Sequence, residues 1–251
     1  MKYQKADIQY FTHPHLFQEY YNIIYQRLLP KKEINRVCEL GAGGNPTLTQ
    51  AVIEEQGLDY WVTDVSEKAL ANCADTYQKK VIDVQQKDIS TTLGKFDLIF
   101  SKMLVEHLPH PSTFHRNIFN ALSPNAYAFH FFPTLGSLTL WLNHLLPELL
   151  TKPLLMWAEP SRRAERFGKF STYYHWCEGP SRSNMERFEE LGFEVELYYG
   201  GYGHKYYERI APLHWLEQQK SRVLQQLKWP GWTANACVLL KKHAKAQRRK
   251  E

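Results

Sequence analysis

Short apolar segments alternate with amphipathic ones between residues 34 and 132 of this 251-residue chain. The apolar segments are bounded by glycine, proline or polar residues, and we expect them to form strands at 34–40, 59–64, 80–84, 96–101 and 126–132. The intervening segments carry the signals of helices, which we expect at 48–56, closed by Gly57, at 66–79, capped by Ser66, and at 112–122. Strands that alternate with helices in this way imply a parallel sheet with right-handed crossovers.

The two ends of the chain add further elements. Residues 14–29 carry apolar side chains at helical spacing, and Pro30 ends this predicted helix. Beyond Pro133 the alternation stops, and we expect a helix at 183–191, mostly helical structure at 205–228, and strands at 193–199 and 234–242. The pattern therefore predicts an α/β fold in which a seven-stranded, mostly parallel sheet is flanked by helices.

The most apolar segment, residues 135–157, is long enough to cross a membrane. It contains Glu148 and Lys152, and placing one charge at the centre of a bilayer costs roughly 2.5–3.5 kcal/mol. Pro147 and Pro153 would break it into two short amphipathic helices. We therefore expect no stable membrane insertion. Peripheral contact with a membrane surface and packing within the protein stay open as alternatives.

A glycine-rich turn follows the first strand of the alternating region, where residues 37–45 read Val-Cys-Glu-Leu-Gly-Ala-Gly-Gly-Asn. Glycines let the backbone approach a ligand closely, and the helix that follows offers unpaired N–H groups. Asp64 ends the second strand, 23 residues after Gly41, where a carboxylate can accept hydrogen bonds from both hydroxyls of a ribose. Asp88 follows the third strand and could accept from an adenine amino group. All three features would lie at the carboxyl edge of the sheet, where ligands bind.

These residues resemble the class I S-adenosylmethionine-dependent methyltransferases. The resemblance rests on Glu39-Leu-Gly-Ala-Gly-Gly, on the two aspartates, and on residues 101–111, which are similar to the EHL segment of small-molecule members. It implies a Rossmann-like sheet and S-adenosylmethionine as cofactor, with Glu39 at its methionine end, Asp64 at its ribose and Asp88 at its adenine. The cofactor-binding residues that it implies are Glu39, Gly41, Ala42, Gly43, Asp64, Val65, Asp88, Ile89, Ser101, Lys102 and Met103.

The resemblance covers residues 34–132, with the last two predicted strands completing the sheet. Two features depart from the family pattern: Asn45 and Pro46 stand where a third glycine is usual, and residues 200–233 separate two strands that usually form a tight hairpin. We expect a single methyltransferase domain over residues 1–251. Its expected parts are a core of 31–133 and 191–242, helical cap insertions at 134–190 and 200–233, and a basic tail at 243–251.

The chemistry implied by the resemblance asks little of the protein. The sulfonium supplies an activated methyl group, so the site must mainly align an in-line attack and exclude water, and a general base is optional. His107 and His130 are candidate bases, with structural packing as the alternative for each. The expected cap could bind an anionic or aromatic acceptor, or it could be a solvated arginine-rich helix beside a small aromatic core. Its candidate substrate residues are Arg166, Tyr173, Tyr174 and His175.

The charge distribution and the cysteines indicate which partners and which cellular compartment to expect. The net charge is +5, and the last eleven residues carry all of it, so we expect no nucleic-acid partner. Ser101-Lys-Met-Leu also differs from the Asn/Asp-Pro-Pro-aromatic motif of enzymes that methylate base amino groups. The four cysteines have no metal-binding spacing, so we expect no metal, and they suit a reducing cytoplasm. The N-terminal segment lacks the apolar run of a signal peptide.

Together these observations predict methyl transfer from S-adenosylmethionine to the oxygen or nitrogen of a small-molecule acceptor, with little or no help from a metal. Two alternatives stay open. An NAD(P)-dependent oxidoreductase would share the glycine turn and Asp64, although it would not explain Asp88. A protein that binds the cofactor or a partner without catalysis would share every feature, because no catalytic residue is obligatory. The acceptor and the oligomeric state are not indicated by the sequence.

Overall fold

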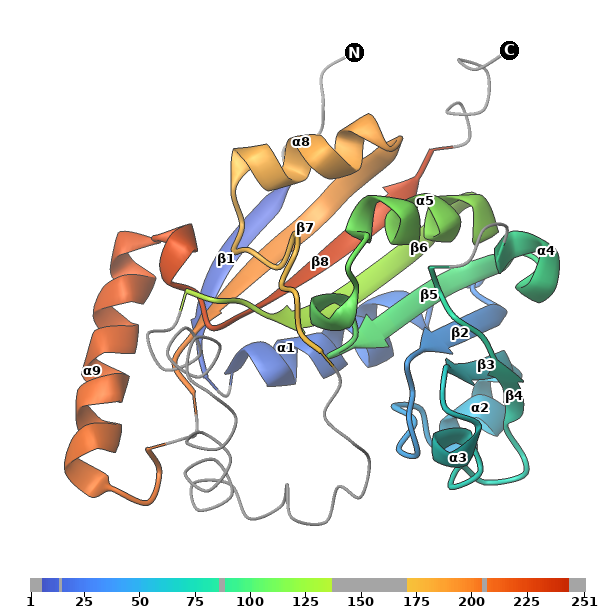
Figure 1. The fold of residues 1–251 in the computed structure, drawn as a ribbon, viewed down its shortest axis with the longest axis horizontal. Coiled ribbons are helices and arrows are strands. Elements are labelled where there is room, and N and C mark those ends of the chain that lie inside the picture. The colour runs from blue at the N-terminus through green and yellow to red at the C-terminus, as the bar shows by residue number, and fades with distance from the viewer. Residues whose placement is uncertain (1–5, 14, 86–88, 137–170, 205–206, 244–251) are drawn as a thin grey trace.

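The computed structural model describes residues 6–13, 15–85, 89–136, 171–204 and 207–243. Within these ranges eight strands form one sheet in the order β1-β7-β8-β6-β5-β2-β3-β4 (Figure 1). In that spatial order the strands are β1 (Asp7–Thr12), β7 (Phe193–Tyr202), β8 (Asn235–Lys242), β6 (Leu122–Pro133), β5 (Phe96–Lys102), β2 (Arg36–Leu40), β3 (Asp59–Asp64) and β4 (Gln78–Val81). β8 runs antiparallel to β6 and β7, and every other pair is parallel, which confirms the predicted mostly parallel sheet.

The prediction of seven strands is wrong by one, because β1 adds to the free edge of β7. Its register pairs Asp7 with Leu197 and Thr12 with Tyr202. No side chain of β1 is buried, so the segment lacks the apolar alternation that marks a half-buried strand. Backbone hydrogen bonds hold it, together with close packing of the Tyr10 ring, which would lie 3.0 Å from a Cβ placed on Gly200.

The helices lie on both faces of the sheet. Their bounds are α1 (His15–Asn22), the π-helical turn η1 (Ile23–Leu28), α2 (Gln50–Gln56), α3 (Glu67–Leu70), α4 (Ile89–Leu93), the 3-10 turn η2 (Val105–His107), α5 (Pro111–Ala121), α8 (Arg182–Glu190), α9 (Ala211–Leu227) and the 3-10 turn η4 (Pro230–Trp232). α2 ends as its glycine predicts, because Gly57 has the left-handed φ of +63° and its N–H bonds back to the helix.

The helix expected at 66–79 is much shorter than predicted. Ser66 caps it as expected by accepting a hydrogen bond from Ala69 N, but α3 ends at Leu70 and turns follow. β4 then begins at Gln78, two residues before the predicted strand, and pairs with β3. Edge pairing with β3 therefore overrides the helical propensity of the residues near 78.

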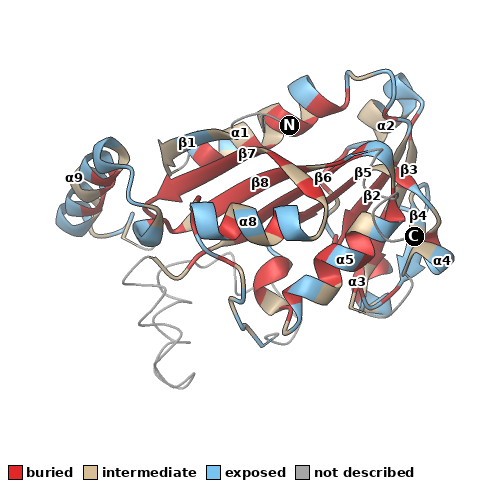
Figure 2. Ribbon diagram, turned by 90° about the horizontal axis from the view of Figure 1, so that it is seen from above, coloured by how far each residue is buried: buried red, intermediate tan, exposed pale blue. Residues whose placement is uncertain are grey.

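Two apolar layers cover the sheet, and successive residues of β5 divide between them. Leu98 and Phe100 join the layer of α1 and η1, whereas Ile99 joins the layer of α5 and α8. Figure 2 shows α5 and α8 on one face of the buried strands and α1 on the other. This arrangement leaves the carboxyl ends of the parallel strands as an edge between the layers, where the glycine turn lies.

Figure 1 shows α9 at the left of the molecule, beside the ends of β1 and β7 rather than over a face of the sheet. Gln225 Nε2 donates a hydrogen bond of 2.8 Å to Tyr10 O, so the helix satisfies part of the edge that β1 would otherwise expose. β7 extends to Tyr202, so the second expected insertion begins within a strand. Most of the first insertion lies outside the described residues. No helix among those described is long and apolar enough to span a membrane.

Candidate functional site

The glycine turn needs glycine at two of its positions. Gly41 and Gly43 have φ values of +65° and +58°, in the left-handed region that other residues rarely adopt. A Cβ on Gly41 would lie 2.9 Å from Leu104 Cδ1, so this position is also closed by packing. A Cβ on Gly43 would meet no atom within 4 Å. The turn is therefore packed on the side of Gly41 and open beside Gly43.

Asp64 joins this turn to the end of β3. Its Oδ2 accepts a hydrogen bond of 3.0 Å from Gly43 N, and its Oδ1 accepts one of 2.9 Å from Ser66 N. An ionised carboxylate can accept about four hydrogen bonds, so each oxygen retains capacity for a ligand hydroxyl. The side chain is half-buried. Asp64 thus lies in contact with the glycine turn, as the predicted ribose site requires.

Glu39 points into the protein. Its Oε2 accepts a hydrogen bond of 2.7 Å from Thr47 N, and its Oε1 accepts one of 2.7 Å from Thr47 Oγ1. The Tyr60 hydroxyl also donates a hydrogen bond to Oε2. Burial raises the pKa of Glu39, although these hydrogen bonds act in the opposite direction. The carboxylate ties the far end of the turn to β3. Sequence reasoning missed Thr47 and Tyr60, because only the pairing of β2 with β3 brings Tyr60 beside Glu39.

The ends of β3 and β5 expose two large apolar side chains. Val65 is 53% exposed just beyond β3, and Met103 is 37% exposed just beyond β5. Met103 has the unusual φ of +55° for a residue with a side chain, and its N–H donates 2.9 Å to Phe131 O. Such a backbone persists only where the surroundings hold it. Lys102, before it, donates 3.3 Å to the Tyr21 hydroxyl on α1.

The two candidate bases have different surroundings, and His130 is completely buried. Its Nδ1 lies 2.8 Å from Ser101 Oγ, which is also buried. Burial lowers the pKa of His130 to about 3, so the ring is neutral at physiological pH. Its Nε2 is buried with no hydrogen-bond partner among the described residues. A nearby ring, His115, is also buried and stacks on Trp176 at 5.8 Å.

His107 lies nearer the surface, in η2. Its Nδ1 donates a hydrogen bond of 2.9 Å to Ser171 O, because a carbonyl oxygen can only accept. Its Nε2 lies 3.8 Å from Oε1 of Glu106. Burial raises the pKa of Glu106 to about 8, and its Oε2 has no hydrogen-bond partner within the described ranges. The Glu106 carbonyl also accepts from Tyr173 N and Tyr174 N, which fixes the segment after residue 170 against η2.

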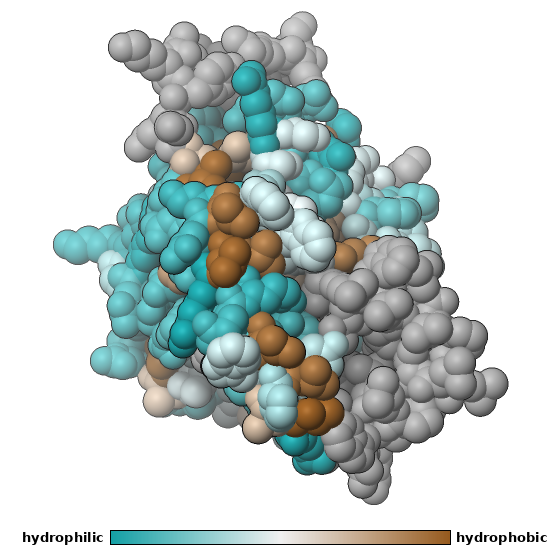
Figure 3. Space-filling model, turned by 90° about the vertical axis from the view of Figure 1, so that its left-hand side faces the viewer, coloured by the Kyte–Doolittle hydropathy of each residue, from teal (hydrophilic) through white to brown (hydrophobic). Residues whose placement is uncertain are grey.

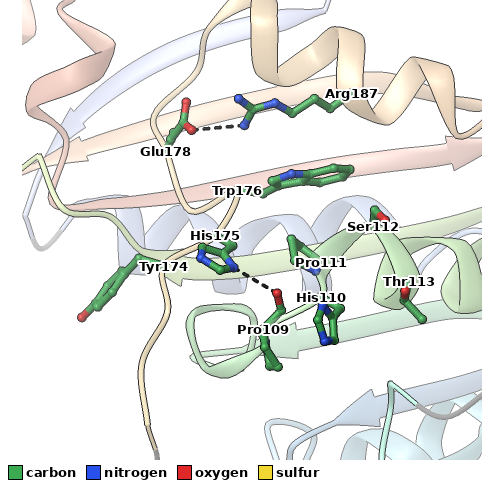
Figure 4. A pocket seen from close by; sticks show the side chains of 10 residues that line it. All are labelled: Pro109, His110, Pro111, Ser112, Thr113, Tyr174, His175, Trp176, Glu178 and Arg187. Carbon is green, nitrogen blue, oxygen red and sulfur yellow. Dashed lines mark hydrogen bonds and ion pairs between the residues drawn. The ribbon is translucent and has the colours of Figure 1, made fainter.

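A hollow of about 580 Å³ opens beside this segment. Figure 4 shows its lining, which is Pro109, His110, Pro111, Ser112, Thr113, Tyr174, His175, Trp176, Glu178 and Arg187. His175 Nδ1 donates 3.0 Å to Pro109 O, and Arg187 pairs with Glu178 at 3.1 Å. The guanidinium of Arg187 lies 5.9 Å from the centre of the Trp176 ring. The structure thus brings the predicted substrate residues Tyr174 and His175 to one hollow.

The remaining predicted residues are only partly described. Asp88 and Arg166 lie outside the described residues, and Ile89 begins α4 with a side chain that is not described. Ala42 is buried and its N–H donates to Thr63 O, while Tyr173 is 42% exposed. Within the described ranges no group of three His, Cys, Asp or Glu side chains could hold a metal ion.

Comparison with solved structures shows the same fold. A SAM-dependent methyltransferase from Archaeoglobus fulgidus is similar with a TM-score of 0.54 and 16% identity, covering 92% of this chain and 100% of that one. A structure of the StiE O-MT is similar with a TM-score of 0.53 and 11% identity, and the match covers 91% of this chain and 74% of that one. A third similar structure is that of phosphoethanolamine N-methyltransferase 2 from Haemonchus contortus in complex with S-adenosyl-L-methionine. Its TM-score is 0.50 at 16% identity, and the match covers 90% of this chain and 53% of that one.

Sequence comparison identifies the family. No curated protein matches the chain in sequence. The profile of the methyltransferase-domain family, however, matches residues 13–197, which is well over half of the chain. This stretch includes the glycine turn, Asp64 and the η2 segment. The protein therefore belongs to the methyltransferase-domain family and has the fold of S-adenosylmethionine-dependent methyltransferases, which confirms the resemblance indicated by its sequence.

Proposed function

We propose that this enzyme transfers the methyl group of S-adenosylmethionine to the oxygen or nitrogen of a small-molecule acceptor. The observation that carries the proposal is the contact between Asp64 and Gly43 at the carboxyl edge of the sheet. It combines an open glycine backbone with a carboxylate that retains acceptor capacity. Methyl transfer to oxygen and methyl transfer to nitrogen both occur on this fold, since the similar structures include an O-MT and an N-methyltransferase.

The residues at this edge fit the proposed cofactor. The open space beside Gly43 admits a ligand close to the backbone, and Asp64 would accept the ribose hydroxyls. Val65 and Met103 offer exposed apolar surface just beyond β3 and β5, the two strands that flank β2. Gly41, Ala42 and the rest of the turn would shape the methionine side, with Glu39 holding the turn from within. Asp88 and Ile89 would bind the adenine, as the family resemblance implies.

The chemistry follows from the activated methyl group, which the cofactor supplies when bound. The protein then has to orient the acceptor and accept a proton where the acceptor loses one. His107 is suited to this second task, because its Nδ1–H donates to Ser171 O, which makes Nε2 the nitrogen that can take up a proton. His130 is buried with a pKa of about 3, so in this proposal it positions Ser101 instead.

The acceptor site is proposed at the hollow beside η2. Tyr174 and His175 line it together with Trp176 and Arg187, which combine aromatic surface with a cation. These side chains suit a small molecule that carries an aromatic ring or an anionic group. Tyr173 is the third described residue that the sequence assigns to the acceptor, and the fourth predicted residue, Arg166, lies outside the described residues.

Calorimetry with purified protein tests the cofactor. We expect binding of S-adenosylmethionine and S-adenosylhomocysteine, and none of NAD. Binding of NAD alone would instead support the oxidoreductase alternative. Once an acceptor is found by screening acidic and aromatic small molecules, His107→Asn should lower kcat while the cofactor dissociation constant stays unchanged. An unchanged kcat in this variant would remove His107 from the mechanism.

A further inference from the structure

Exposed apolar side chains gather on one segment of the molecule. Of the twelve large apolar side chains that are exposed among the described residues, seven lie between 213 and 232, in α9 and η4. Figure 3 shows apolar atoms among polar ones on the side of the molecule where α9 lies. Single exposed apolar residues are common, but a concentration of this kind marks an interaction surface.

The side of α9 that is buried against the protein carries Glu217, Ser221 and Leu224. Glu217 and Ser221 are buried at its inner side, where Ser221 Oγ donates to Glu217 O and Glu217 accepts two hydrogen bonds of 2.7 Å from Lys220. Gln225 reaches β1, as described above. These contacts fix the rotation of the helix about its axis. A small rotation of α9 that buried its exposed apolar side chains would therefore break these contacts.

Four of the exposed residues form a stripe along α9. Leu213, Leu216, Val223 and Leu227 are separated by three, seven and four residues, a spacing that places them on one side of a helix. They are between 40% and 55% exposed. We call these four residues the α9 stripe. Trp229 and Trp232, each 50% exposed, continue the apolar surface into η4.

The charges around the α9 stripe have one dominant sign. Arg209, Arg222 and Lys228 are exposed, and Glu208 is the only exposed acid among described residues 207–233. Glu217, the other acid of this stretch, is buried and paired with Lys220. The surface is thus apolar with a cationic surround. Leucine and valine on one side of a helix, tryptophan at its end and basic residues nearby are typical of helices that lie in the interface of an anionic membrane.

We propose that α9 and η4 dock on an anionic lipid surface, with the α9 stripe, Trp229 and Trp232 in the headgroup region and the basic residues at the lipid phosphates. α9 lies at one end of the molecule, beside the ends of β1 and β7, which lets it meet a flat surface (Figure 1). Attachment to a lipid surface does not depend on the proposed methyl transfer, and a failure of one leaves the other standing.

Co-sedimentation of the full chain with lipid vesicles tests the proposal. We expect binding to vesicles that contain phosphatidylglycerol, and much weaker binding to vesicles of phosphatidylcholine alone. Leu216→Ser combined with Val223→Ser should lower binding to the anionic vesicles at least tenfold. Val81→Ser is the matched control, because Val81 is 48% exposed on β4, at the opposite edge of the sheet, and should leave binding unchanged. Thermal unfolding by circular dichroism checks that each variant is folded.

Three results would overturn the proposal. One is the absence of binding to anionic vesicles. Another is equal binding by the parent and the double variant, which would assign attachment to the basic residues at 241–250 instead, since both proteins retain them. The third is a dimer in solution that the double variant splits into monomers, which would show that the α9 stripe binds a second copy of the chain.

Discussion

At the scale of single residues, Asp64 has two roles that can be separated by experiment. Its carboxylate accepts hydrogen bonds from Gly43 N and Ser66 N, so it shapes the protein. In the proposed function it also accepts hydrogen bonds from the ribose. A charge-assisted hydrogen bond contributes more than a neutral one, so loss of the carboxylate should affect binding clearly.

We therefore expect Asp64→Ala to weaken binding of S-adenosylmethionine at least tenfold, which corresponds to about 1.4 kcal/mol. Isothermal calorimetry provides the dissociation constant. Asp75→Ala is the control, because the Asp75 side chain is fully exposed and its ion pair is with Lys79. An Asp64 variant that is folded and binds as tightly as the parent protein would exclude Asp64 from the site.

Glu106, also a single residue, should make the stability of the protein depend on pH. Burial raises its pKa from 4.5 to about 8, so between these values the folded protein keeps a proton that the unfolded chain loses. The free energy of unfolding should then fall as the pH rises from about 4.5 to about 8. Glu106→Gln removes this titration. We expect the variant to be more stable than the parent at pH 8, by about 1–3 kcal/mol, and no more stable at pH 4.5.

Denaturant unfolding at several pH values measures this difference. Glu178→Gln is the control, because Glu178 lies in the same region but is exposed and paired with Arg187. Parallel pH profiles for the parent and the Glu106 variant would contradict the burial argument.

At the scale of elements, comparing the turns after β2 and α2 separates the effect of backbone strain on stability from the effect of lost ligand contact on binding. Gly43 and Gly57 both have left-handed backbones, with φ of +58° and +63°, and a Cβ on either would meet no atom within 4 Å. Alanine at either position should therefore destabilise the fold by about 1–2 kcal/mol through backbone strain alone. Only Gly43 lies in the proposed site.

We expect Gly43→Ala and Gly57→Ala to lower the melting temperature by similar amounts, while only Gly43→Ala weakens binding of S-adenosylmethionine. Thermal unfolding and calorimetry on the two variants give both quantities. Equal affinities in the two proteins would mean that the cofactor does not approach the backbone at Gly43.

At the scale of the whole molecule, the buried histidines connect elements that are distant in sequence. His115 on α5 stacks on Trp176, and its ring centre lies 5.2 Å from that of His130 on β6. Burial lowers the pKa of both rings, to about 3 for His130. The unfolded chain therefore binds protons below pH 6.5 that the folded protein excludes, and the free energy of unfolding should fall as the pH falls below 6.5.

His115→Phe keeps the aromatic contacts and removes one of these titrations. We expect the variant to lose less stability than the parent between pH 6.5 and pH 4, as measured by denaturant unfolding. His110→Phe, at an exposed position, should follow the parent curve. A His115 variant that is as sensitive to acid as the parent would show that burial of His115 does not contribute to the acid sensitivity.

The sequence by itself determined the features that depend on neighbours along the chain. Apolar segments bounded by turn residues predicted the central strands, and the bounds of β3 agree with the prediction at both ends. The glycine turn, the Ser66 cap and the Gly57 helix end were also predicted, because each depends on a local backbone conformation or a local hydrogen bond. The same local pattern, with Asp64 in register, carried the family resemblance.

Only the tertiary structure decided the features that depend on partners far away in sequence. β1 is held by backbone hydrogen bonds to β7, which leave no apolar pattern, and α3 gives way to a strand because β3 offers an edge to pair with. Glu39 points inward because Tyr60 and Thr47 meet it there, and α9 buries the side that carries Glu217, Ser221 and Leu224 because β1 lies beside it. Backbone pairing and burial are set by residues brought together on folding, so no pattern along the chain encodes them.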